Sequence, residues 1–102
     1  MESMRLGGNI ELTGFNELDN SSMVVLKKIV GNYAKRMSEL THKFEVLSLV
    51  MKPIHKTEAS NKYEIHAKLM DNGKPVTSQI TDRNLFFAVD TSLKKIVNSI
   101  GK

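Results

Sequence analysis

The sequence predicts an α+β fold: a two-layer sandwich in the order β-α-β-β-β-α, with two helices on one face of a four-stranded sheet. Two segments carry apolar residues at the 3.6-residue period of a helix, and four others alternate or run apolar as strands do. The chain has 102 residues, of which 40% are apolar and 25% are charged. This size supports one compact core and not two, so we expect a single domain over residues 1–102.

The first half of the chain predicts a strand followed by a long helix. Residues 9–15 form the expected strand, with Ile10 and Leu12 on one face. The helix is expected from about Ser22 to Leu40. Three residues ahead of it can cap its free N–H groups: Asp19, Asn20 and Ser21. Its apolar stripe has helical spacing and consists of Leu26, Ile29, Val30, Tyr33, Met37 and Leu40.

Three more strands are expected in the middle of the chain. Residues 44–52 are strongly apolar, and Pro53 should end the regular pairing of that strand. A polar, turn-like segment at residues 56–61 leads into residues 62–70, which alternate clearly between apolar and polar side chains. Asp71-Asn72-Gly73 then predicts a tight hairpin, because Asn and Gly accept positive φ. The last strand contains Val76, Ser78 and Ile80.

A second helix closes the chain, and Asp82 is its expected N-cap. Asp90 and Lys94 are four residues apart, which predicts an ion pair on the surface of this helix. The apolar stripe that should face the sheet consists of Leu85, Phe86, Val89, Leu93, Ile96 and Ile100.

The composition excludes several classes of protein. There are no cysteines, so a disulfide scaffold or a zinc finger is not available, and a reducing cytoplasm is the expected location. No apolar run approaches the roughly 18 residues of a membrane span, and the first residues do not resemble a signal peptide. There is also no glycine-rich phosphate loop. We expect a cytoplasmic protein that is not an enzyme and uses no cofactor, metal or membrane.

Three histidines are the remaining candidates for catalysis or metal binding: His42, His55 and His66. His55 and His66 flank the expected central hairpin, and Glu58 or Glu64 is the candidate carboxylate beside them. Two histidines and a carboxylate that belong to no known motif often occur in a sequence by chance. An enzymatic function is therefore the least favoured hypothesis, and it requires His55 and His66 to converge with a carboxylate in a cleft.

The basic residues are the more informative signal. Fifteen Lys and Arg against eleven Asp and Glu give a net charge of +4. If the two helices lie side by side, their outer surfaces merge into one positive surface that suits RNA phosphates. An equally favoured alternative is that these residues only keep the helices soluble. The candidate RNA-binding residues are Lys27, Lys28, Lys35, Arg36, Lys94 and Lys95.

Apolar side chains in unexpected positions indicate a possible interface. Phe87 projects roughly opposite the stripe of the second helix, where it could stack on a base, fill a protein interface or contact the flank of the helix. The strand over residues 44–52 is apolar on both faces, although helices cover only one. Either Val46, Ser48 and Val50 or the alternate residues can face the helices. The possible interface residues are Leu47, Leu49, Met51 and Phe87.

The closing helix also carries a family resemblance. Residues 84–90, Asn-Leu-Phe-Phe-Ala-Val-Asp, followed by Leu93, Lys95, Ile96 and Ile100, resemble the last helix of the ribosome hibernation-promoting factors. This family is also called ribosome-associated inhibitor or sigma-modulation proteins. Residues 9–13 are similar to its opening strand, and residues 50–55 are similar to the end of its second strand. Phe87 stands where the family usually has a small residue, and Asn98 where a basic residue is common.

The resemblance implies a fold akin to double-stranded-RNA-binding domains and a protein of the small ribosomal subunit. Members of the family sit in the mRNA and tRNA channel and contact its RNA through basic helix residues. By position, that role would fall to Lys27, Lys28 and Lys35 on the first helix and to Lys95 on the second. The chain ends at Lys102, so we expect the short form, without the domain through which long members pair ribosomes.

The leading hypothesis is therefore a ribosome-associated RNA-binding protein that occupies the small-subunit channel and represses translation. Its expected partner is small-subunit RNA. The alternative is a homodimeric protein-interaction module that uses the open face of the sheet and has no nucleic-acid role.

Overall fold

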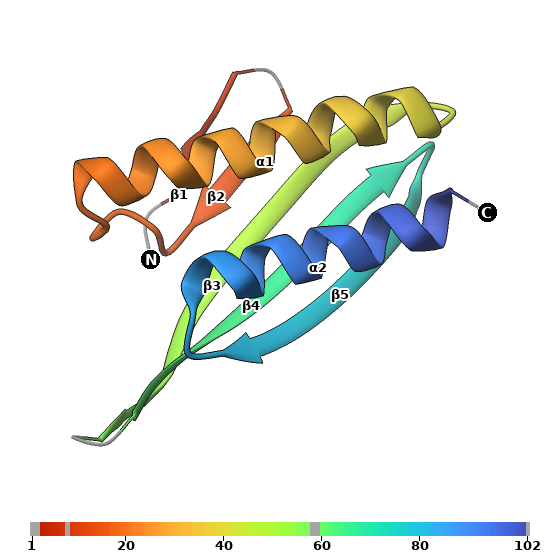
Figure 1. The fold of residues 1–102 in the computed structure, drawn as a ribbon. Coiled ribbons are helices and arrows are strands. Elements are labelled where there is room, and N and C mark those ends of the chain that lie inside the picture. Colours follow the sequence, from red (N-terminus) through yellow and green to blue (C-terminus); the bar gives the residue numbers. More distant parts are fainter. Residues whose placement is uncertain (1–2, 8, 58–59, 102) are drawn as a thin grey trace.

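The computed structural model describes residues 3–7, 9–57 and 60–101 (Figure 1). Its elements are β1 (Ser3–Arg5), β2 (Ile10–Thr13), α1 (Asn20–Leu40), β3 (Phe44–Thr57), β4 (Ser60–Asp71), β5 (Lys74–Asp82) and α2 (Leu85–Ile100). Both helices lie side by side on one face of the sheet, as Figure 1 shows. The predicted α+β class and the two layers are confirmed.

The sheet has five strands in the order β1-β2-β3-β4-β5, so the prediction of four strands was wrong. The additional strand is β1, which pairs antiparallel with β2 through Ser3 and Thr13. Their hydroxyl groups also share a hydrogen bond of 2.8 Å. Three residues are too few for the alternation that predicts a strand from sequence, and β1 is held by its partner rather than by a pattern of its own.

The sheet is mixed because β2 and β3 run parallel and every other neighbouring pair runs antiparallel. Parallel neighbours need a long connection, and α1 provides it by crossing one face of the sheet. The predicted hairpin is confirmed between β4 and β5, where Asp71 pairs with Lys74. Asn72 and Gly73 have φ values of 51° and 82°, the left-handed conformation that this turn requires.

Strand β3 runs on through Pro53 to Thr57, beyond the predicted end at Lys52, but its regular register does end at Pro53, as predicted. Parallel pairing with β2 stops at Val50. Beyond that point β3 is an edge strand, where the missing N–H of proline is tolerated, and the register shifts between Pro53 and His55. The end of the β3–β4 hairpin therefore projects beyond the rest of the sheet in Figure 1.

Both helices begin at side-chain caps. The Asp19 carboxylate accepts a hydrogen bond from the Ser22 N–H at 3.4 Å, as one of the three predicted caps for α1. The cap of α2 is Asn84, whose side chain accepts from the Phe87 N–H at 3.1 Å. The prediction of Asp82 was wrong, because its carboxylate instead accepts from the Asn84 N–H at 2.8 Å and fixes the turn before the helix.

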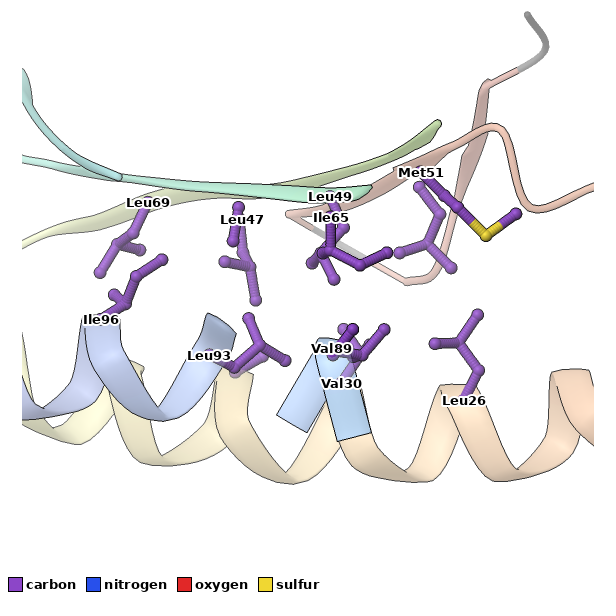
Figure 2. Packing of buried hydrophobic residues seen from close by; sticks show 14 of the residues in the cluster. Leu26, Val30, Leu47, Leu49, Met51, Ile65, Leu69, Val89, Leu93 and Ile96 are labelled. Carbon is purple, nitrogen blue, oxygen red and sulfur yellow. The ribbon is translucent and has the colours of Figure 1, made fainter. Parts of the chain in front are cut away.

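The core lies between the sheet and the two helices (Figure 2). Side chains from the inner face of the sheet meet side chains from both helices in Figure 2: Leu47, Leu49, Met51, Ile65 and Leu69 against Leu26, Val30, Val89, Leu93 and Ile96. The buried hydroxyl of Ser92 donates to the Val89 carbonyl at 2.8 Å. The Ser92 carbonyl accepts from the Ser78 hydroxyl at 2.7 Å, which joins α2 to β5. Within the described ranges, no helix is both long and apolar enough to span a membrane.

A polar contact joins the two helices. The Tyr33 hydroxyl of α1 donates a hydrogen bond of 2.9 Å to the Asp90 carboxylate of α2. Asp90 makes no salt bridge with Lys94 within the part of the chain that the structure describes, so the predicted ion pair was wrong. Burial, the hydrogen bond to Asp90 and the negative charge of Asp90 together raise the pKa of Tyr33 to about 12.

Replacing Tyr33 with Phe should lower the free energy of unfolding by about 1 kcal/mol at neutral pH, because the bond to Asp90 is lost. The phenol of the unfolded chain ionises near its ordinary pKa of 10.0, whereas the folded protein holds the proton up to about 12. The unfolded state then binds fewer protons, so stability falls between these two pH values. The difference in the free energy of unfolding between the wild type and the Tyr33→Phe variant should therefore be constant below about pH 10 and shrink between pH 10 and about 12.

Urea unfolding of both proteins at about pH 8 and about pH 11 measures this difference, and the titration of lysines cancels in it. In the Asp90→Asn variant, ultraviolet absorbance of the phenolate should report a lower pKa for Tyr33. An equal difference in stability at both pH values would contradict the assignment.

Candidate nucleic-acid interface

Six cationic side chains form the surface that we call the basic helix face: Lys27, Lys28, Lys35, Arg36, Lys94 and Lys95. All six are exposed. Their orientation follows from the packing of each helix. In α1 the buried positions are Leu26, Val30, Ala34 and Met37. At about 100° per residue, Lys28 and Lys35 then point away from the sheet.

In α2 the same argument places Lys94 on the outer surface. The buried positions of this helix are Leu85, Ala88, Val89, Ser92, Leu93, Ile96 and Val97. Lys94 therefore faces away from the sheet, whereas Lys95 lies toward the β5 flank, on the side of Ser92. On α1, Arg36 lies on the flank next to α2, and its charge acts on Tyr33. Lys27 lies on the opposite flank.

The two helices hold these cations on one side of the molecule. The Tyr33–Asp90 hydrogen bond joins the middle of α1 to the middle of α2. Near their C-terminal ends, a Cβ built on Gly101 would lie 3.8 Å from the Leu40 side chain. The helices thus run parallel in contact. Lys28 and Lys35 share an outer surface with Lys94, with Lys27, Arg36 and Lys95 around them.

Few acidic groups oppose this charge. Glu39 is the single acidic residue of α1 and Asp90 is the single acidic residue of α2. Asp90 already accepts a hydrogen bond from Tyr33. In the part of the chain that the structure describes, the salt bridge is His66–Glu64, on the other side of the sheet. None of the six cations of the basic helix face has a carboxylate partner there.

The open face of the sheet differs in its charge pattern. Two of its cations lie directly opposite acidic residues in the strand register, Arg5 opposite Glu11 and Lys52 opposite Glu64. A shallow depression of about 550 Å³ lies on this face, lined by Ser48, Val50, His66, Ala67, Lys68, Thr77, Ser78 and Gln79. This face has partly compensated charges and mixed polarity.

The structure corrects three of the predicted interface residues. Leu47 and Leu49 are fully buried, and Met51 is 7% exposed, because all three point toward the helices. They cannot line the open face. The alternate residues of β3, among them Ser48 and Val50, point to the open face instead. A strand that is apolar on both faces gives no sequence signal for which face the helices cover.

The strand register keeps His55 and His66 apart, so the described backbone does not bring them together in the cleft that a catalytic role requires. His66 pairs with Val50 in the ladder, whereas His55 pairs with Lys62, five positions further along β3. At about 3.3 Å per residue, these positions are roughly 16 Å apart. The side chain of His55, like Glu58, lies outside the described part of the chain, and His42 is exposed in the turn after α1. Among the described residues, no group of three or more acidic, histidine or cysteine side chains could hold a metal.

Phe87 is where the sequence predicts it, on the outer surface of α2, and its side chain is 56% exposed. Sequence reasoning missed the polar depression on the open face. Its residues come from three strands, and the register that brings them together depends on pairings far apart in the chain.

Comparison with known proteins gives the fold. No protein-family model matches the sequence, and no curated protein matches it. The N-terminal domain of Protein Y from Thermus thermophilus superimposes with a TM-score of 0.65 at 14% identity, covering 96% of this chain and 97% of that one. A ribosomal subunit interface protein from Coxiella burnetii superimposes with a TM-score of 0.61 at 16% identity, covering 90% and 92%.

Both solved structures are of hibernation-promoting factor family proteins, the family that the closing helix of this sequence resembles. The predicted resemblance is thus confirmed in three dimensions, and the chain has the fold of these proteins over almost its whole length.

Proposed function

We propose that this chain is a ribosome-associated RNA-binding protein whose basic helix face contacts RNA of the small subunit. The observation that carries the proposal is the exposure of six cations on two helices in direct contact, and none of the six has a carboxylate partner among the residues that the structure describes. Phosphate groups attract ammonium and guanidinium groups without regard to sequence. Lys28, Lys35 and Lys94, which share the outer surface of the helices, are therefore suited to phosphates of a folded RNA.

The shared fold supports a ribosomal partner. One of the two similar structures is described as a ribosomal subunit interface protein, and the likeness covers nearly all of both chains. We propose that the protein lies in the mRNA and tRNA channel of the small subunit in the cytoplasm. There it represses translation by steric exclusion, as a non-enzymatic hibernation factor consisting of one domain.

The alternative, a homodimer through the open sheet face, has less support. Leu47, Leu49 and Met51, on which it rested, are buried under the helices. Of its residues only Phe87 is available at the surface, and Phe87 lies on the helix side. Light scattering distinguishes the two functions, because a stable dimer that does not bind RNA would favour the alternative.

Reversing charge on the first helix should weaken binding to small ribosomal subunits. The Lys28→Glu, Lys35→Glu double variant places two acids at the centre of the basic helix face, and we expect at least about tenfold weaker association at low salt. The matched control is Lys62→Glu with Lys68→Glu, which makes the same change in net charge on exposed residues of β4. Equal losses in both variants, measured by co-sedimentation, would show that only net charge matters.

Binding should also depend steeply on salt. The logarithm of the association constant is expected to fall by about 0.7 to 0.9 per logarithmic unit of salt for each phosphate neutralised. Neutralising Lys28 and Lys35 with Gln should reduce this slope by about 1.4 to 1.8. Fluorescence anisotropy of a labelled RNA across a salt series gives both slopes. A wild-type slope near zero would be evidence against phosphate contacts.

Occupancy of the channel has its own test. Small subunits loaded beforehand with mRNA and initiator tRNA should bind the protein less tightly than empty subunits, because both would need the same space. In a purified translation system, adding the protein before mRNA should inhibit more strongly than adding it afterwards. Equal binding to empty and loaded subunits would place the protein elsewhere on the ribosome.

A further inference from the structure

Phe87 is an exposed aromatic residue in the first turn of α2, on the outer surface of the helix. Four large apolar side chains are exposed in the part of the chain that the structure describes: Val24, Val25, Leu40 and Phe87. Phe87 is the aromatic one among them and is 56% exposed. A partly exposed ring can add contact area with a partner, and the surroundings of this ring indicate which partner it fits.

The backbone holds the ring on the outside of α2. The Phe87 N–H is bonded to the cap residue Asn84 at 3.1 Å, and the next two residues, Ala88 and Val89, are fully buried. The first turn of the helix therefore cannot rotate to bring the ring into the core. On the same outer surface Lys94 follows seven residues later, about two turns along the helix.

The contact between the helices places a second cation beside the ring. The hydrogen bond between Tyr33 and Asp90 brings these stretches of the two helices side by side. Phe87 precedes Asp90 by three residues and Lys28 precedes Tyr33 by five, which at about 1.5 Å per residue places them roughly 5 Å and 8 Å toward the N-terminal side of that bond. Packed helices are about 8–10 Å apart. Phe87 thus lies between Lys28 across the surface and Lys94 along it.

We propose that Phe87 is a stacking site for an unpaired base of single-stranded RNA, with Lys28 and Lys94 holding the phosphates on either side. This inference rests on the proposed RNA-binding function and adds a preference to it. An aromatic ring between cations is the arrangement by which proteins hold single-stranded nucleic acid. In a duplex the faces of the bases are already stacked, so Phe87 contributes affinity only for unpaired segments.

Charge disfavours a second copy of the chain as the occupant. A symmetric contact through Phe87 would bring the same patch of two molecules together. Lys28 and Lys94 of one copy would then face the same cations of the other, and in the described part of the chain neither lysine has a salt-bridge partner. Like charges across an interface oppose association, whereas a polyanion neutralises both lysines.

The chain contains no tryptophan, so the Phe87→Trp variant carries a single fluorescent reporter at the proposed site. The probes are a single-stranded oligouridine of about 12 nucleotides and a perfect RNA duplex of the same length. We expect the single strand to quench the indole emission by stacking, and the duplex to bind without comparable quenching. Equal quenching by both probes would overturn the proposal.

The Phe87→Ala variant measures the contribution to affinity. Stacking of one base corresponds to a loss of roughly 5- to 150-fold for the single strand, with duplex affinity changed less than about twofold. Phe87→Leu keeps an apolar side chain without a ring face and should lose affinity in the same direction. The matched control is Val24→Ala, because Val24 is 57% exposed on the other helix, and it should bind as the wild type does.

Each outcome separates this inference from the proposed function. If Phe87→Ala binds the single strand normally while the Lys28→Glu, Lys35→Glu variant does not, the stacking site is wrong and RNA binding stands. If the wild type binds neither RNA nor small subunits, both proposals fail. A wild-type dimer that Phe87→Ala dissociates would make the ring a protein interface and overturn the stacking site.

Discussion

The burial of one row of side chains on the central strands determines how the rest of the molecule is arranged. Leu47 and Leu49 of β3 and Ile65 of β4 point to the same face of the sheet and need a cover (Figure 2). Two helices provide it, and each has only one apolar stripe to bury. Because both stripes pack against the same face of the sheet, the polar surfaces of both helices face solvent on the same side. The basic helix face is a geometric consequence of this packing.

Local patterns explain how much of the fold could be predicted from the sequence. The stripes of both helices and the Asp71–Gly73 turn depend on residues within a few positions of each other, so period and turn chemistry reveal them. The outward orientation of Lys28, Lys35 and Lys94 follows from the same stripes. The sequence predicts that these lysines share one surface only if the two helices lie side by side. The Tyr33–Asp90 hydrogen bond shows that they do.

The features that could not be predicted depend on partners distant in the chain. β1 is too short to show the alternation of a strand, and it is a strand only because its backbone pairs with β2. The face of β3 that the helices cover is ambiguous in an all-apolar strand, and pairing decides it. Asp90 has Lys94 one turn away, yet its partner is Tyr33, 57 residues earlier in the chain. The Tyr33 phenol lies at the contact between the helices and bonds Asp90 in a partly buried site. An exposed ion pair with Lys94 would add little to the free energy of unfolding.

The distribution of charge between the two faces supports the proposal that the helix side is the one that would meet RNA. The net charge is only +4, and an even spread of such a charge would orient the molecule weakly. On the open face, Arg5 and Lys52 lie opposite Glu11 and Glu64, so their fields partly cancel over short distances. On the helix side the lysines have no such partners among the described residues, and their potentials add. Under the proposed function, a polyanion approaching through solvent would therefore be drawn to the helices first, where the Phe87 ring is exposed.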